Sequence, residues 1–184
     1  GPDQSGVYCA DGVSLGHRRL SVIDLSEHGR QPMTNEDKTV WMVFNGEIYN
    51  FPELRPELAA KGHHFISNSD SEVIIHAYEE YGADCVSKLR GMFAFAIWDS
   101  RKKVLFLVRD RIGIKPLYYY CKDGKLVFAS EIKAILQHPT ISREVNLQAL
   151  YDYIGFEFVP APETMFKNIN KLPAGHYLQF KAGN

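Results

Sequence analysis

The sequence predicts a mixed α+β domain built on antiparallel sheets. The chain has 184 residues, the size of one ordinary domain. Short apolar runs typical of strands outnumber helical stretches. Short polar turns separate successive runs, which indicates hairpins and not the long crossovers of a parallel sheet.

The predicted strands are apolar runs bounded by turn residues. They cover residues 39–44, 93–98, 104–108, 117–121 and 126–129. The first run ends at Asn45-Gly46, a turn dipeptide. The second and third runs form one predicted hairpin, and the last two runs form another, so we expect an antiparallel meander.

Three helices are predicted from apolar spacing and from residues that start or stop helices. They cover residues 52–60, 71–81 and 146–155. Gly82 closes the second helix, and either Ser69 or Asp70 is a candidate N-cap for it. Glu72 lies three residues after Ser69, as a capping box requires. Asn146 is the expected cap of the third helix.

The composition gives no sign of a highly charged partner. Charged residues make up 23% of the chain, and the formal net charge is -1. This balance gives no reason to expect nucleic acid or a membrane surface as partner. No apolar stretch is long enough to span a bilayer. A small polar substrate or another protein surface fits this composition as well as any other partner.

The cysteines and histidines predict no metal centre. Cys9, Cys85 and Cys121 are widely spaced and form no CxxC pair, and free thiols suit a cytoplasmic location. His63 and His64 are adjacent, so in a strand they would point to opposite faces, which is poor geometry for one ion. We therefore expect no bound metal.

Asn45 and Gly46 are the most suggestive candidates for catalysis. An amide side chain and a backbone N–H aimed at one point make an oxyanion hole. The alternative is a tight turn that closes a hairpin, and the local sequence alone favours the turn.

Two charged residues are candidate ligands. Arg19 could grip a carboxylate with two hydrogen bonds, or it could be a solvated cation at a strand end. Asp70 could bind an ammonium group, or it could complement the dipole of the following helix. Residues 109–111, Arg-Asp-Arg, are interpreted as an ion-pair corner that orders the loop after them.

Eight short motifs, in one order, resemble the glutaminase half of the glutamine-hydrolysing asparagine synthetases, which are class II glutamine amidotransferases. The motifs lie at residues 1–3, 16–24, 31–33, 45–50, 69–72, 91–96, 109–118 and 129–134. The resemblance runs from Gly1 to about Tyr177, nearly the whole chain.

The resemblance implies both a fold and a reaction. The implied fold is the N-terminal-nucleophile hydrolase type, a four-layer αββα sandwich of two antiparallel sheets. The implied reaction is hydrolysis of glutamine to glutamate and ammonia, with the ammonia used for ATP-dependent amidation of aspartate.

The resemblance also assigns roles to residues. Asn45 and the Gly46 N–H correspond to the oxyanion hole. Arg19 corresponds to the residue that holds the substrate α-carboxylate. The residues that correspond to the rest of the glutamine pocket are Glu47 and Asp70 for the α-ammonium, and the backbone at Val22 and Ile23.

The chain departs from the family pattern at its start. The family nucleophile is a cysteine at the mature N-terminus, and its own α-amine serves as the base, since an α-amino pKa of about 7.7–8.0 suits that role. Here the chain begins at Gly1, and its three cysteines are internal. We therefore expect residues 1–184 to be a single amidotransferase domain that lacks its nucleophile segment and is inactive as given.

The expected partners follow from the same resemblance. Glutamine is the expected substrate, and a C-terminal synthetase domain of the same chain is expected to bind ATP and Mg²⁺, with no cofactor in this domain. A second copy of the chain, in a homodimer, is a further candidate. Two alternatives stay open: a non-catalytic binding module of the same fold, and the glutaminase domain of an amidotransferase with another acceptor.

Overall fold

The computed structural model describes residues 1, 3–10, 12–20 and 23–181. The strands are β1 (Gln4–Ala10), β2 (Val13–Arg19), β3 (Met33–Thr34), β4 (Val40–Ile48), β5 (Gly91–Asp99), β6 (Val104–Arg109), β7 (Tyr118–Lys122), β8 (Lys125–Ala129), β9 (Ile169–Lys171) and β10 (Tyr177–Lys181). The helices are η1 (Glu27–Gly29), α1 (Phe51–Ala60), α2 (Glu72–Tyr81), η2 (Gly82–Asp84), α3 (Cys85–Lys88), α4 (Ile132–Ile135) and α5 (Leu147–Phe156).

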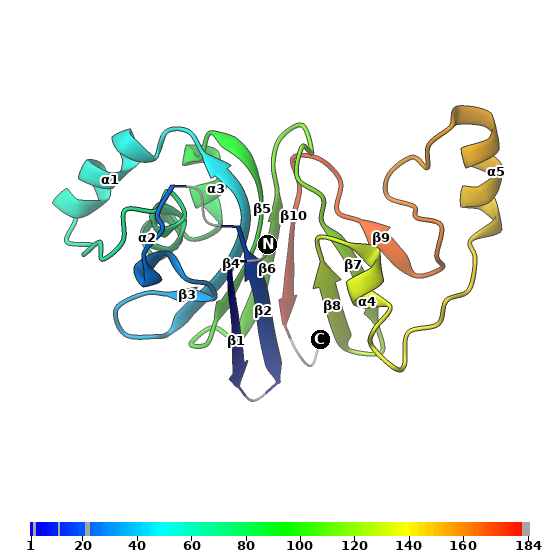
Figure 1. Cartoon of the computed structure of the whole chain (residues 1–184), viewed down its shortest axis with the longest axis horizontal. Coiled ribbons are helices and arrows are strands. Elements are labelled where there is room, and N and C mark those ends of the chain that lie inside the picture. Colours follow the sequence, from blue (N-terminus) through cyan, green and yellow to red (C-terminus); the bar gives the residue numbers. More distant parts are fainter. Residues whose placement is uncertain (2, 11, 21–22, 182–184) are drawn as a thin grey trace.

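A five-stranded antiparallel sheet forms the centre of the molecule, in the order β10-β6-β5-β4-β3. Its longest pairing joins β4 to β5, with Phe44 opposite Phe95. On one face of this sheet, Phe44, Phe95 and Phe106 pack into a core with buried residues of α1 and α2. Figure 1 shows these helices together on one side of the sheet.

The opposite face of the central sheet packs against a second β layer. This layer consists of the β1-β2 hairpin and a three-stranded sheet in the order β8-β7-β9. Leu15, Val43, Leu107 and Leu172 are buried between the two layers. A smaller core that includes Ile135 lies between the β8-β7-β9 sheet and α4.

The layers therefore run helix, sheet, sheet and helix, which confirms the predicted α+β class. The second β layer is divided into two parts, and β2 and β8 are separate edges of it. This division positions the site described below.

The predicted helices and hairpins are confirmed to within a few residues. β5 pairs with β6, and β7 pairs with β8, both antiparallel. Asn146 caps α5 by accepting the N–H groups of Gln148 at 3.2 Å and Ala149 at 3.3 Å.

The predicted capping box at α2 is wrong. Ser71 occupies the N-cap position, and its side chain makes no capping hydrogen bond. The Glu72 carboxylate turns back to the preceding loop, where it accepts the N–H groups of Ile66 and Ser67, each at 2.8 Å. The loop before α2 is buried, so its own donors compete for the acidic side chains.

Two global features bear on the sequence-based expectations. Cys9, Cys85 and Cys121 are all free. In the described part of the chain, every helix is too short or too polar to cross a bilayer.

Candidate active site

A cavity of about 1500 Å³ opens between β2, β8 and the central sheet. The described residues that the sequence analysis proposed for the site all line it: Arg19, Ile23, Asn45, Gly46, Glu47 and Asp70. Val22 lies outside the described residues. The cavity thus brings together side chains from β2, β4 and the loop before α2.

Asn45 and Gly46 lie inside β4, so the prediction of a turn at this dipeptide is wrong. Asn45 is paired with Ala94 of β5, and Gly46 is paired with Phe93. Gly46 has a φ of 149°, and a Cβ there would lie 2.1 Å from the Met92 carbonyl oxygen. Only glycine allows β4 and β5 to approach this closely.

The Asn45 amide is free to act on a ligand. Among the residues that the structure describes, the amide has no hydrogen-bond partner, although Asn45 is partly buried and lines the cavity. Its donors can therefore reach a negatively charged oxygen in the cavity, as an oxyanion hole requires.

Arg19 is a buried cation and not a solvated one. It is 7% exposed, at the end of β2. Its guanidinium donates to the Gln4 side-chain oxygen at 3.0 Å and to the Asp24 carbonyl oxygen. No described carboxylate forms an ion pair with it, so the charge is held by neutral acceptors at the wall of the cavity. A buried guanidinium in this state favours an anionic ligand.

Asp70 and Glu47 supply negative charge to the same cavity. Asp70 is 5% exposed, and its carboxylate accepts the Ile48 N–H at 2.8 Å. Burial, with a smaller contribution from the negative charge of Glu47, raises the pKa of Asp70 above its ordinary value. An ammonium group bound between Asp70 and Glu47 would offset the cost of the Asp70 charge.

Asp24 holds the loop after β2 in place. Its carboxylate accepts the N–H of Ser26 and the N–H of Asn68, both at 2.8 Å. The second bond joins this loop to the segment that carries Asp70. The Ser26 hydrogen bond, with backbone donors and the Arg19 charge, holds the pKa of Asp24 below its ordinary value.

The other end of the cavity was missed by the sequence analysis. Its floor is made of small and apolar residues of β5, including Ala94, Ala96 and Trp98, and its far wall is β8. The alternation of these β5 residues with Phe93 and Phe95 was visible in the sequence, but nothing in it indicated that β8 would lie across a gap from β2.

Comparisons with known proteins agree with this geometry. Residues 1–184 match the family described as a glutamine amidotransferase domain. The chain is 46% identical over 175 residues to asparagine synthetase [glutamine-hydrolyzing] 1 of Bacillus subtilis, and 45% identical over 183 residues to asparagine synthetase 3 of the same organism. It is also 40% identical over 178 residues to amidase chyE of Penicillium rubens.

The chain corresponds to only part of these relatives. The alignments cover 95%, 98% and 97% of the chain but 27%, 30% and 26% of the respective relatives. Among solved structures, glutamine phosphoribosylpyrophosphate amidotransferase from B. subtilis is similar, with a TM-score of 0.56 and 25% identity. That match covers 66% of this chain and 28% of the other. The family match over the full length and the shared fold show that this chain belongs to the glutamine amidotransferase domain family.

Proposed function

We propose that this domain binds glutamine and hydrolyses its side-chain amide to glutamate and ammonia. One observation carries the proposal: one cavity is lined by a buried Arg19, by the acidic pair Glu47 and Asp70, and by Asn45, whose amide has no hydrogen-bond partner among the described residues. Arg19 would hold the α-carboxylate, and the two acids would hold the α-ammonium. Free glutamine carries an α-carboxylate and an α-ammonium on the same carbon. A glutamine residue within a peptide lacks both charges, so this arrangement distinguishes the two.

The reacting end of glutamine would lie against Asn45 and Gly46. Attack on the amide carbon places negative charge on its oxygen, and the Asn45 amide and Gly46 N–H would stabilise that charge. The tetrahedral intermediate then expels ammonia and leaves an acyl-enzyme, which water hydrolyses to glutamate.

The nucleophile in this proposal is a cysteine at the mature N-terminus, on a segment that precedes Gly1. Its α-amine would accept the thiol proton and deliver it to the departing nitrogen. The part of the cavity between β2 and β8, with its apolar floor, has room for such a segment. None of the internal cysteines suits this role, because none has a free α-amine.

The ammonia would serve a synthetase domain of the same protein. The relatives named asparagine synthetase are about three to four times longer than their match to this chain. We infer that a C-terminal domain of the same chain uses ATP and Mg²⁺ to amidate aspartate, in the cytoplasm, and that the protein is a homodimer. The domain described here needs no cofactor for its own reaction.

Two alternatives are tested with the main proposal. Amidase chyE, at 40% identity, carries a different name from the synthetases, so another amide acceptor is the second candidate. A non-catalytic binding module of the same fold is the third candidate.

The test is to measure ammonia release from glutamine by the chain with its upstream segment restored. We expect release from the restored protein and none from its variant with alanine in place of the N-terminal cysteine. The chain of residues 1–184 alone is expected to be inactive. Binding of glutamine without ammonia release by the restored protein would favour the non-catalytic alternative.

A further inference from the structure

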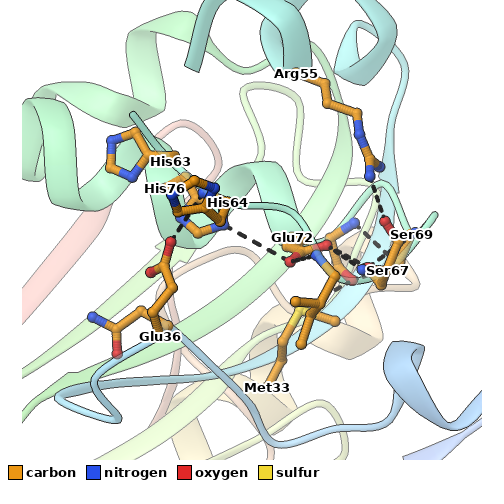
Figure 2. A network of polar contacts seen from close by, with 12 residues as sticks. Met33, Glu36, Arg55, His63, His64, Ser67, Ser69, Glu72 and His76 are labelled. Atoms are coloured by element: carbon orange, nitrogen blue, oxygen red, sulfur yellow. Dashed lines mark hydrogen bonds and ion pairs between the residues drawn. The ribbon is translucent and has the colours of Figure 1, made fainter. Parts of the chain in front are cut away.

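Two histidines and a glutamate meet on the helix side of the central sheet, away from the cavity described above. Glu36 lies in the loop between β3 and β4, His63 follows α1, and His76 lies within α2. One ligand atom from each side chain lies within 4.8 Å of the other two. The rings of His63 and His76 are 4.9 Å apart, and Figure 2 shows the Glu36 carboxylate directed toward them.

His76 has a buried ring nitrogen that the protein leaves without a hydrogen bond. The residue is 2% exposed, and its Nε2 atom has no hydrogen-bond partner. The carboxylate of Glu72 lies 3.8 Å from this nitrogen, too far for a hydrogen bond. Glu72 is already used, because its two oxygens accept the N–H groups of Ile66 and Ser67. A buried polar atom without a hydrogen bond is costly, so a ligand bound to Nε2 would stabilise the fold.

The remaining contacts prepare this group of residues for a cation. The other ring nitrogen of His76, Nδ1, lies 3.1 Å from the Glu79 carboxylate. Metal-bound histidines commonly donate their second ring N–H to a carboxylate, which leaves the first nitrogen as the ligand. One oxygen of Glu36 accepts the His64 N–H at 3.0 Å, which keeps the carboxylate near the histidines and leaves its other oxygen available.

We propose that Glu36, His63 and His76 form a binding site for a divalent transition-metal ion such as Zn²⁺. Two imidazoles and one carboxylate suit Zn²⁺, whereas Mg²⁺ and Ca²⁺ prefer oxygen ligands. Tetrahedral coordination with bonds of about 2.0–2.1 Å brings ligand atoms to roughly 3.4 Å from one another. Glu36 is exposed, so its side chain can close that distance and the ion can enter from solvent.

Nearby acids add negative charge around the site. Glu79 lies 3.7 Å from His63 Nδ1, and Glu80 lies 3.6 Å from His63 Nε2. An ion at this site would join the β3-β4 loop, the segment after α1 and helix α2. The site does not depend on the proposed glutaminase reaction.

A proton is the alternative occupant of His76. Burial lowers the pKa of His76, but the carboxylates of Glu72 and Glu79 outweigh burial and raise it to about 9. A protonated ring would hold Nε2–H near Glu72 without any metal. The experiment must therefore separate a metal site from a buried ion pair.

The experiment is a titration of the tag-free, full-length protein, treated with chelator, with Zn²⁺ in a calorimeter and with Co²⁺ in a visible absorption spectrometer. We expect one Zn²⁺ per chain, a higher melting temperature with Zn²⁺, and the visible bands of tetrahedral Co²⁺. Excess Mg²⁺ or Ca²⁺ should not displace Co²⁺ or Zn²⁺ from this site.

Variants at the rim identify the ligands without disturbing the core. His63→Ala and Glu36→Gln should each weaken Zn²⁺ binding at least about tenfold, which is the lower end of the loss for second-shell changes. His28→Ala, an exposed histidine in η1, is the matched control and should bind Zn²⁺ like the unaltered protein. Absence of Zn²⁺ binding, or equal binding by the His63 and Glu36 variants, would overturn the proposal and leave a proton as the only occupant.

Discussion

The Asp70 carboxylate accepts the backbone N–H of Ile48 at 2.8 Å, which holds the loop before α2 against the end of β4. Asp70 therefore has a structural bond as well as a proposed role in ligand binding. Two substitutions separate these roles. Asparagine keeps an acceptor oxygen for the Ile48 N–H and removes the charge, whereas alanine removes both.

We predict that Asp70→Asn weakens glutamine binding and does not lower stability. Loss of one hydrogen bond to a charged group costs about 1.5–3 kcal/mol, or roughly ten- to a hundredfold in KM. The folded-state pKa of Asp70 is raised, so its charged form opposes folding at pH values above that pKa, and removal of the charge removes this cost.

The checks are KM for glutamine in the restored enzyme and urea unfolding of the same variants. Asp70→Ala should raise KM similarly and also lose about 1 kcal/mol of stability, because Ile48 loses its acceptor. Unchanged KM with lowered stability in Asp70→Asn would leave Asp70 as a purely structural residue.

Asn45→Ala is expected to lower kcat about a hundred- to thousandfold. This is the usual loss for one oxyanion-hole donor. Since the Asn45 amide makes no hydrogen bond within the described residues, the melting temperature should not change. Asn170→Ala, on β9 and outside the cavity lining, is the control for loss of a strand amide. An unaltered kcat in the Asn45 variant would exclude the oxyanion role.

Gly46→Ala should destabilise the fold. The added Cβ would lie 2.1 Å from the Met92 carbonyl oxygen, and the φ of 149° disfavours any side chain. Backbone strain of this kind costs about 1–3 kcal/mol. Gly155→Ala, in α5, is the control, because its Cβ meets nothing within 4 Å and alanine favours helix. Urea unfolding of the two variants should therefore shift in opposite directions.

Much of the fold could be predicted because local sequence and tertiary burial agree. β5 and β6 are continuous apolar runs, and both are buried on two faces. β1 was not predicted, because the pattern of its apolar residues does not match the pattern of burial. Val7 faces solvent, whereas Gly6 lies inward. β10 could have been found from the alternation of Leu178 and Phe180, which face the core.

The site was harder to predict because it depends on contacts between distant segments. At Asn45-Gly46 the local preference is a turn, and only the pairing with β5 makes the dipeptide part of a strand. Similarly, Glu36, His63 and His76 have no metal-binding spacing in sequence, and the packing of α1, α2 and the β3-β4 loop brings them together. The resemblance to a family supplied the residue roles that local patterns could not.

Residues 109–111 form a structural corner, as predicted. The prediction that ion pairs hold this corner is wrong, because hydrogen bonds to the backbone hold it. The buried Asp110 carboxylate accepts the N–H groups of Phe93, Ile112, Ile114 and Lys115. The arginines on either side donate to backbone carbonyl oxygens, for example Arg111 to Leu89 at 2.7 Å.

These bonds predict loss of stability in acid. Burial raises the pKa of Asp110, but the backbone donors outweigh burial and hold it below the ordinary value. The stabilisation is therefore complete above the unfolded-state pKa of about 3.9 and is lost as the pH falls through the lower folded-state pKa.

Asp110→Asn should lower the free energy of unfolding by about 1.5–3 kcal/mol at pH 7. Its further loss of stability in acid should be smaller than that of the unaltered protein. Asp123→Asn, in the exposed turn between β7 and β8, should change neither value. Urea unfolding at neutral and acidic pH measures both effects. If the Asp110 variant and the unaltered protein lose the same amount of stability in acid, the acid sensitivity comes from other carboxylates.

The last prediction concerns α5, which presents an apolar face to solvent. Leu147, Tyr151 and Ile154 are 70%, 75% and 74% exposed, at positions that share one face of a helix. Large exposed apolar patches mark interaction sites, and the chain spans less than a third of the first synthetase relatives. If the proposed synthetase domain covers this face, Ile154→Glu should weaken the contact without destabilising the domain itself. Full burial of one isoleucine contributes about 1.5–3 kcal/mol, so the contact should weaken roughly ten- to a hundredfold.

In the full-length Ile154→Glu protein we expect glutamine hydrolysis to continue. The amount of amidated product per glutamine should fall, while synthesis from free ammonia persists. Gln148→Glu, an exposed polar position on the same helix, is the control. A full yield of product per glutamine in the Ile154 variant would show that α5 is not part of the contact between the two domains.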